Sequence, residues 1–256
     1  MSNSPLVSYT KLSPYTYGKR NHAIDTISIH CMAGNLSVES CGQMFQTSKS
    51  SSNYGIGSDG RIGMYVEEGY ASWCTSNRSN DNRAVTIEVA NCAKGEPWPI
   101  TEKAYKSLID LLVDICQRNG IPKLLWKGDK NLVGQVDRQN MTVHRWFAAK
   151  ACPGDWLYSR HGQIAAEVNK RLEAAKAGKD EEAMDTKQLT SCADTGDNPS
   201  AWAKEATDYC KRKGIFAGDG AGNYGWQKPI TREATAQIIY NLLEAAGMLE
   251  KLPDVK

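Results

Sequence analysis

The chain has 256 residues, of which 41% are hydrophobic and 23% charged, and its 31 basic and 29 acidic side chains leave a formal net charge of +2. This is the composition of an ordinary globular protein, so it excludes a disordered or fibrous chain. The balanced charge argues against a nucleic-acid partner, and no apolar run approaches the roughly 18 residues that a membrane span requires.

The beginning of the chain and the cysteines bear on the cellular compartment. The first thirty residues lack a cationic start, an apolar segment and a small-residue cleavage site, so we expect no secretory signal and synthesis in the cytoplasm. The eight cysteines include no CxxC pair. We therefore expect mostly reduced thiols that pack as small core residues.

Strand and helix patterns alternate from the start of the chain. Residues 23–30 (AIDTISIH) are a β-branched run typical of a strand, and Asn35 is the predicted N-cap of a helix over residues 36–46. Residues 53–57 and 61–66 flank an Asp-Gly turn. That turn chemistry predicts a hairpin.

The same alternation continues in the middle of the chain. Residues 84–90 (AVTIEVA) predict another strand, and a long helix is predicted from Thr101 to a C-cap at Gly120. Residues 141–144 predict a short strand, and residues 158–175 a closing amphipathic helix. Interleaved strands and helices predict an α/β domain with a mixed central sheet flanked by helices.

Composition changes once, at residues 173–198, which are polar, charged and poor in large apolar groups. We interpret this segment as a linker. It separates a predicted domain of residues 1–172 from a small helical module of residues 199–256.

Two of the four histidines end predicted strands, His30 in ISIHCMAG and His144 in TVHRWFAAKACPGD. The Pro-Gly turn after Cys152 is able to return that thiol to the imidazoles. Two imidazoles and one thiolate form a three-ligand set, which in zinc chemistry marks a catalytic site with water in the fourth position. An alternative interpretation explains the same three residues equally well. In it, His30 and His144 are core histidines whose hydrogen bonds are satisfied, and Cys152 is a buried thiol.

Two charged residues favour the catalytic interpretation. Glu88 interrupts an apolar strand, where a carboxylate is costly unless it has a partner or a function. The alternation places it on the cleft side of the sheet, whereas the alternative is a solvent-facing position on an edge strand. Lys150 places a cation two residues before Cys152, although alone it would be interpreted as a solvated lysine.

Four segments, IHCMAG, SSNYGIGSDGRI, TIEVAN and TVHRWFAAKACPGD, occur in this order. Together they resemble the type-2 N-acetylmuramoyl-L-alanine amidases, a family that includes phage lysozyme-like amidases and animal peptidoglycan recognition proteins. The resemblance covers about residues 22–172. It implies a zinc hydrolase that cleaves the amide between N-acetylmuramic acid and the L-alanine of peptidoglycan.

The resemblance also implies roles for individual residues. His30, His144 and Cys152 would hold Zn²⁺. Glu88 would take and return protons, and Lys150 together with Tyr54 would stabilise the oxyanion.

The sequence departs from the family pattern at one place. Many members carry an AWHAG-like motif, and this chain has SWCTS at residues 72–76. That histidine is not usually a metal ligand, so the departure concerns substrate contacts more than zinc binding.

Residues 199–247 predict a helix, a glycine-rich loop and a second helix. The patterns WAKEAxxYCxxxGIFAG and PITREAxAQII are similar to one S-layer homology motif, which binds secondary polymers of the Gram-positive cell wall. The resemblance singles out Thr231, Arg232 and Glu233 as wall-binding residues. Because such motifs usually occur in threes, we expect either self-association through residues 199–256 or weak targeting by one motif. A helical hairpin that merely docks on the first domain is the alternative.

Three functions compete. The first is a zinc amidase with a wall-targeting module, a phage or prophage endolysin that acts on the bacterial wall after release. The others are a non-catalytic peptidoglycan-binding protein on the same fold and a cytoplasmic amidase that recycles muropeptides. Cys152 favours an enzyme, because binding-only relatives generally lack the cysteine.

Overall fold

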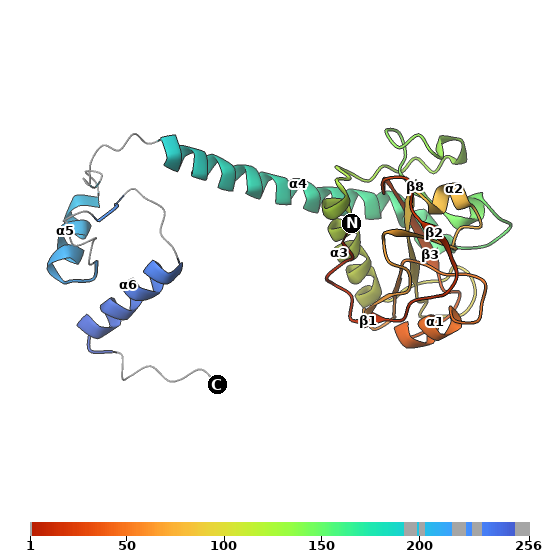
Figure 1. Ribbon diagram of the computed structural model, residues 1–256, viewed down its shortest axis with the longest axis horizontal. Helices are drawn as coiled ribbons and strands as arrows, with labels where there is room; N and C mark the ends of the chain where they lie inside the picture. The colour runs from red at the N-terminus through yellow and green to blue at the C-terminus, as the bar shows by residue number, and fades with distance from the viewer. Residues whose placement is uncertain (1, 192–198, 200–202, 217–223, 227–231, 249–256) are drawn as a thin grey trace. The chain divides into compact units, whose positions relative to one another are not determined.

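The computed structural model describes residues 2–191, 199, 203–216, 224–226 and 232–248. It divides the chain into two units, Met1–Lys176 and Ala177–Lys256 (Figure 1). Within the described residues, no helix has the length and apolar character needed to cross a bilayer.

The first unit is built on a mixed six-stranded sheet with the strand order β1-β5-β4-β7-β3-β8. Its strands are β1 (Tyr9–Thr10), β3 (Thr26–Cys31), β4 (Tyr54–Ile56), β5 (Ile62–Met64), β7 (Ala84–Val89) and β8 (Met141–Thr142). The β4–β5 hairpin is antiparallel, and the other neighbours pair in parallel. A separate antiparallel pair joins β2 (Thr16–Lys19) to β6 (Tyr70–Ser72). The predicted α/β class and mixed sheet are confirmed.

Helices surround this sheet (Figure 1). In the first unit they are α1 (Val38–Met44), α2 (Arg78–Asp81), α3 (Glu102–Asn119), the 3₁₀ turns η1 (Lys130–Leu132) and η2 (His144–Trp146), and the start of α4 (Asp155–Ser191). The second unit contains α5 (Lys204–Arg212) and α6 (Arg232–Ala245), which confirms the predicted small helical region.

Helix α3 forms where its pattern predicts and covers one face of the sheet. The Thr101 side chain accepts a hydrogen bond from the amide of Ala104, and Gly120 ends the helix at a φ of 68°, which favours glycine. The core between helix and sheet contains Leu108, Leu112, Ile115, Ile27, Ile29 and Ile87. Because side chains alternate along a strand, the residues between these isoleucines stand on the other face of the sheet.

Two helices differ from their predictions. Helix α1 is capped by Ser37, whose hydroxyl accepts from the Ser40 amide, and not by Asn35. Helix α4 begins at Asp155 and continues to Ser191, so it enters the segment that was predicted to be a linker. Alanine, glutamate and lysine are frequent there, and these residues are among the strongest helix formers.

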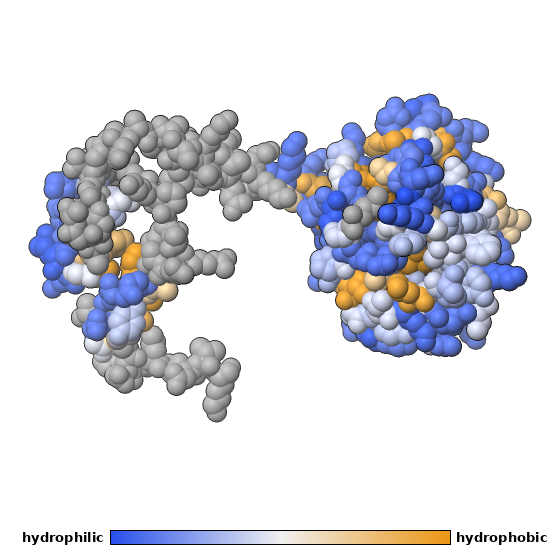
Figure 2. All heavy atoms as spheres, viewed as in Figure 1, coloured by the Kyte–Doolittle hydropathy of each residue, from blue (hydrophilic) through white to orange (hydrophobic). Residues whose placement is uncertain are grey.

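The surface of the first unit is mainly hydrophilic on the face seen in Figure 2, with apolar patches in between.

Seven of the eight cysteines belong to the described residues, and all seven are free thiols, as expected from the sequence. No disulfide therefore staples the described part of the fold.

Candidate active site

The site is built at the ends of the two central parallel strands, β3 and β7. Their register sets His30 opposite Glu88 and Ile29 opposite Ile87. The isoleucines enter the core against α3. His30 and Glu88 therefore stand together on the opposite face of the sheet.

His30 is fully buried, and a serine two residues earlier orients its ring. Its Nε2 lies 3.0 Å from the Ser28 hydroxyl, which donates to the carbonyl of Thr142 at 3.3 Å. With the serine proton used in that bond, Nε2 is the donor and Nδ1 keeps its lone pair. Burial, with smaller contributions from His144 and His161, holds the pKa of His30 well below its usual value. The ring is thus a neutral ligand.

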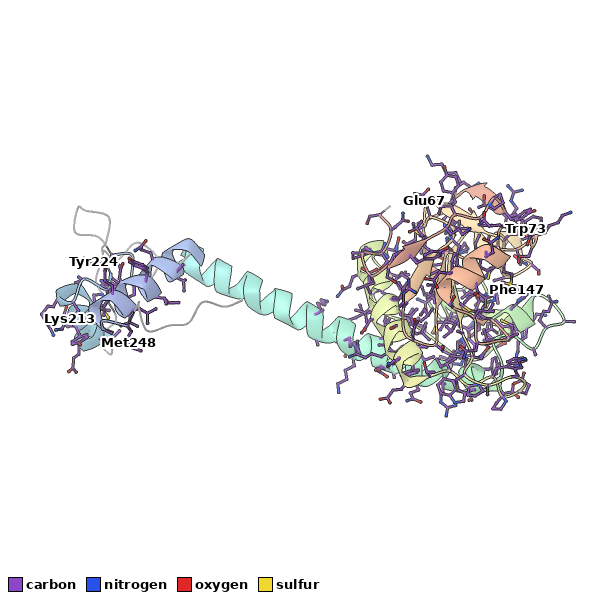
Figure 3. The ribbon with its side chains drawn as sticks, turned by 90° about the horizontal axis from the view of Figure 1, so that it is seen from below. Glu67, Trp73, Phe147, Lys213, Tyr224 and Met248 are labelled. Atoms are coloured by element: carbon purple, nitrogen blue, oxygen red, sulfur yellow. The ribbon has the colours of Figure 1, made fainter. Side chains whose placement is uncertain are left out.

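His144 comes from the turn η2, which follows the short strand β8. Its ring centroid lies 5.2 Å from that of His30, and its Nε2 is 3.3 Å from the hydroxyl of Ser76 in the loop after β6. Burial, followed by the positive charge of Lys150, lowers the pKa of His144. Trp73 and Phe147, which belong to these two loops, both lie at the surface on the same side of the unit (Figure 3).

Cys152 is held by the loop that connects η2 to α4. The Arg145 amide donates to the Cys152 carbonyl at 3.1 Å, and the Arg145 guanidinium pairs with Asp155 at 3.0 Å. Gly154 follows with a φ of +81°, and a Cβ there would lie 2.6 Å from the Cβ of Trp98. Only glycine permits this approach, which fixes the turn beside the sheet.

These elements bring three donor atoms together. The Cys152 sulfur is 3.3 Å from Nδ1 of His30, and the donors of His30, His144 and Cys152 all lie within 4.8 Å of one another. A hydrogen bond with Cys31 and burial raise the pKa of the Cys152 thiol. Two neutral imidazoles and a thiol form a possible metal site of the zinc type.

Glu88 stands beside this set, with its side chain 16% exposed. Its Oε1 lies 3.9 Å from Nδ1 of His30 and accepts from the Cys74 thiol at 3.9 Å, whereas its Oε2 is buried without a partner. Burial raises the pKa of Glu88 well above its usual value. A buried carboxylate with an unpaired oxygen is costly, so it is suited to bind a proton, a water or a cation.

Lys150 lies at the edge of the site, in the exposed part of the loop between η2 and Cys152. Its positive charge is the second cause, after burial, of the lowered pKa of His144. The structure thus brings together four of the six residues predicted for catalysis and metal binding: His30, His144, Cys152 and Glu88.

Comparison with known proteins identifies the family. The family model for N-acetylmuramoyl-L-alanine amidase matches residues 20–155, more than half of the chain. The chain belongs to this family. No curated protein sequence matches the amidase significantly.

Several solved structures are similar to the amidase. PlyL is 16% identical with a TM-score of 0.46, and the match covers 62% of this chain and 95% of PlyL. The endolysin N-acetylmuramoyl-L-alanine amidase LysCS from Clostridium intestinale is 16% identical with a TM-score of 0.45, covering 66% of this chain and 99% of LysCS. A derivative of AmpD is also 16% identical, with a TM-score of 0.45 and coverage of 63% and 96%.

The structure places Tyr54 outside the site. Tyr54 lies opposite Ile87 in the β4–β7 register, so its ring enters the core on the α3 side of the sheet. There its hydroxyl donates to Glu68 at 2.6 Å and accepts from the Ser4 amide at 2.9 Å. Glu68 is itself buried and bound by Arg118. The prediction that Tyr54 stabilises an oxyanion is therefore wrong, because the sheet separates the phenol from the donor set.

One donor was missed from the sequence. Cys74 follows β6 and lies next to Glu88 and His30. The donor atoms of these three residues all lie within 4.8 Å of one another. The available signal was at residues 72–76, where the sequence departs from the family's AWHAG-like motif. Cys74 stands in place of the motif's histidine, and its thiol is also able to bind a metal. The predicted wall-binding Thr231 lies outside the described residues, as do the side chains of Arg232 and Glu233 in α6.

The position of Tyr54 leads to a first prediction. Tyr54→Phe removes two buried hydrogen bonds, so the free energy of unfolding should fall by about 1–3 kcal/mol. Turnover of peptidoglycan per folded molecule should stay unchanged. Denaturant unfolding and an activity assay on the same preparations measure both quantities. A large loss of turnover at unchanged stability would contradict this placement and would support a catalytic role for Tyr54.

Proposed function

We propose that this amidase is a zinc-dependent hydrolase that cleaves the amide between N-acetylmuramic acid and the L-alanine of the peptidoglycan stem peptide. The observation that carries the proposal is that the donor atoms of His30, His144 and Cys152 lie together beside a partly buried carboxylate, Glu88. The donor set fits zinc, because two imidazoles and one thiolate leave one coordination position for water or substrate.

The unpartnered oxygen of Glu88 supports the same assignment. A buried carboxylate oxygen without a hydrogen bond is destabilising in the folded protein unless a proton, a water or a cation completes it. A divalent ion held by the three donors next to Glu88 would offset that cost. The orphaned oxygen and the donor chemistry thus agree on a cation at this place.

In the proposed mechanism, zinc would supply Lewis-acid polarisation of the amide carbonyl. Glu88 accepts a proton from the attacking water and passes it to the leaving amine. Ser28 keeps Nδ1 of His30 free to bind, through the hydrogen bond at Nε2. Lys150, an exposed cation two residues before Cys152, stabilises the negative charge that develops on the carbonyl oxygen.

Product analysis tests the proposed function. Incubation with purified peptidoglycan should create new L-alanine amino termini without new reducing sugar ends. A chelator should abolish the release, and added Zn²⁺ should restore it, because the ligands bind the metal only while it is present. Mass spectrometry and end-group assays measure the products. New reducing ends would identify a glycosidase, and full activity after removal of metal would exclude the zinc mechanism.

Glu88→Gln tests the carboxylate. Turnover should fall by about 100- to 10,000-fold, as is typical when a general base is lost, while the zinc content stays the same. Glu67→Gln is the matched control, because Glu67 is exposed on the surface of the same unit (Figure 3). Equal turnover of the two variants would move the proton-transfer role to another residue.

We further propose that residues 199–256 bind a secondary polymer of the Gram-positive wall, and that the enzyme is a phage or prophage endolysin that acts on the wall after release. The S-layer homology-like motif on α5 and α6 supports this over a recycling enzyme, which has no use for a wall-binding module. The binding-only alternative is disfavoured, because Cys152 completes the donor set.

Arg232→Ala tests wall binding. Binding to purified Gram-positive walls should weaken, because a cation of the motif is removed, whereas hydrolysis of soluble muropeptides should not change. Arg212→Ala, at an exposed position near the end of α5, serves as the control. Co-sedimentation with walls measures the binding. Equal sedimentation of the two variants would remove Thr231, Arg232 and Glu233 from the proposal.

Self-association through the same module is a further proposal. Ile239, Tyr240 and Leu242 on α6 are each about half exposed among the described residues. Exposed apolar side chains of this kind are stabilised when a second copy covers them. Light scattering of the full-length chain should give a mass above that of one chain. A single-chain mass at all concentrations would favour a module that functions alone.

A further inference from the structure

The loop after β6 places a cysteine thiol at the proposed metal centre. Cys74 is 8% exposed, and its amide donates to the carboxylate of Asp81 at 3.1 Å. The same carboxylate accepts from the Thr75 amide at 3.1 Å and from the Thr75 hydroxyl at 2.7 Å. Asp81 is fully buried. These bonds hold the backbone of the loop, so the position of the thiol is set by the fold.

The thiol belongs to a second group of donor atoms. Its sulfur lies 3.9 Å from Oε1 of Glu88, and the same oxygen lies 3.9 Å from Nδ1 of His30. The three donors all lie within 4.8 Å of one another. Bonds of 2.0–2.3 Å to a tetrahedral ion place its ligands about 3.3–3.8 Å apart. Shifts of a few tenths of an ångström would bring Glu88 to ligand distance from both neighbours.

The unpartnered oxygen of Glu88, which supports a cation at the first position, also belongs to this group. The second oxygen of Glu88 is buried and has no hydrogen-bond partner. One thiol, one imidazole and one carboxylate form a set that suits zinc or cadmium, and it is a poor set for magnesium or calcium, which prefer oxygen. The chemical class of the ligand is thus a thiophilic divalent cation.

We propose that Cys74 is a further thiolate ligand of the metal centre, and that Cys74, Glu88 and His30 form a second position for the zinc ion. It adjoins the position formed by His30, His144 and Cys152. Both positions use Nδ1 of His30, because Nε2 is bound to Ser28, so one ion occupies one position at a time. This inference rests on the proposed zinc function and adds an alternative placement of the ion.

The second position has a chemical consequence. An ion bound by Glu88 would compete with the proton of water for this carboxylate, so the first position is the one from which we expect hydrolysis. The second position retains the ion close to the first, because the two share one ligand. Cys74 and Cys152 thus give the centre two thiolates, and the two positions share His30.

Cobalt substitution tests this assignment, because a cysteine thiolate bound to Co²⁺ gives a charge-transfer band in the near ultraviolet. Cys152→Ser removes the only thiolate of the first position. This variant should still bind one equivalent of Co²⁺ and keep the band through Cys74. The double variant Cys152→Ser/Cys74→Ser should lose the band, and its cobalt affinity should fall by at least about tenfold, since even an outer-shell partner contributes about 10- to 100-fold.

The matched control is Cys152→Ser/Cys31→Ser. The Cys31 thiol forms a hydrogen bond with the Cys152 thiol, so Cys31 is the other candidate for a replacement ligand. This control should keep the band. The inference is overturned if Cys152→Ser binds Co²⁺ without the band, if the band survives in the double variant Cys152→Ser/Cys74→Ser, or if the wild-type chain binds two equivalents.

Two further measurements distinguish a failure of this inference from a folding defect and from a failure of the proposed zinc function. Circular dichroism checks that each variant is folded, and Cys152→Ala replaces Cys152→Ser if the serine variant is not. A wild-type chain that binds no cobalt with a thiolate band contradicts the proposed zinc function itself. A wild-type band that is lost completely in both Cys152 variants contradicts only the role of Cys74.

Discussion

The site depends on the register of two parallel strands. Pairing of β3 with β7 sets His30 opposite Glu88, and the neighbouring Ile29 opposite Ile87. A slip of one residue would turn the imidazole into the apolar core and the isoleucine out of it. Burial of branched apolar side chains against α3 opposes such a slip. The hydrophobic core on one face of the sheet therefore holds the polar residues of the other face in position.

Loops supply the remaining donors, and hydrogen bonds hold those loops. His144 stands in the turn η2, and the contacts of Arg145 tie the backbone at Cys152 to the start of α4. Gly154 allows this turn to approach Trp98. On the other side of the site, Asp81 fixes the loop that carries Cys74. Preorganisation of this kind reduces the ordering cost of binding an ion.

Burial determines which chemical forms the site groups adopt. His30 is wholly enclosed and neutral, with its tautomer set by Ser28. Glu88 is mostly buried, and its buried Oε2 has no partner. Such groups destabilise a folded chain unless a ligand compensates them. The folded protein therefore carries an unfavourable free energy at the site, which a bound divalent cation would offset.

Local patterns in the sequence determined much of this protein. The caps and apolar spacing of α3, the Asp-Gly hairpin and the β-branched strands were sufficient to predict the mixed sheet. His30, His144, Cys152 and Glu88 were recognisable as candidates because each lies in a short segment that resembles the amidase family. These features depend on residues close together in the chain, whose interactions do not require the rest of the fold.

Tertiary structure alone decided the face of Tyr54 and the part played by Cys74. Tyr54 lies in a segment that matches the family, yet its register with β7 turns it into the core. Cys74 reaches Glu88 because α2 and its Asp81 hold the loop after β6. Strand register and loop placement arise from contacts between residues far apart in the chain, and a local pattern carries no information about such contacts.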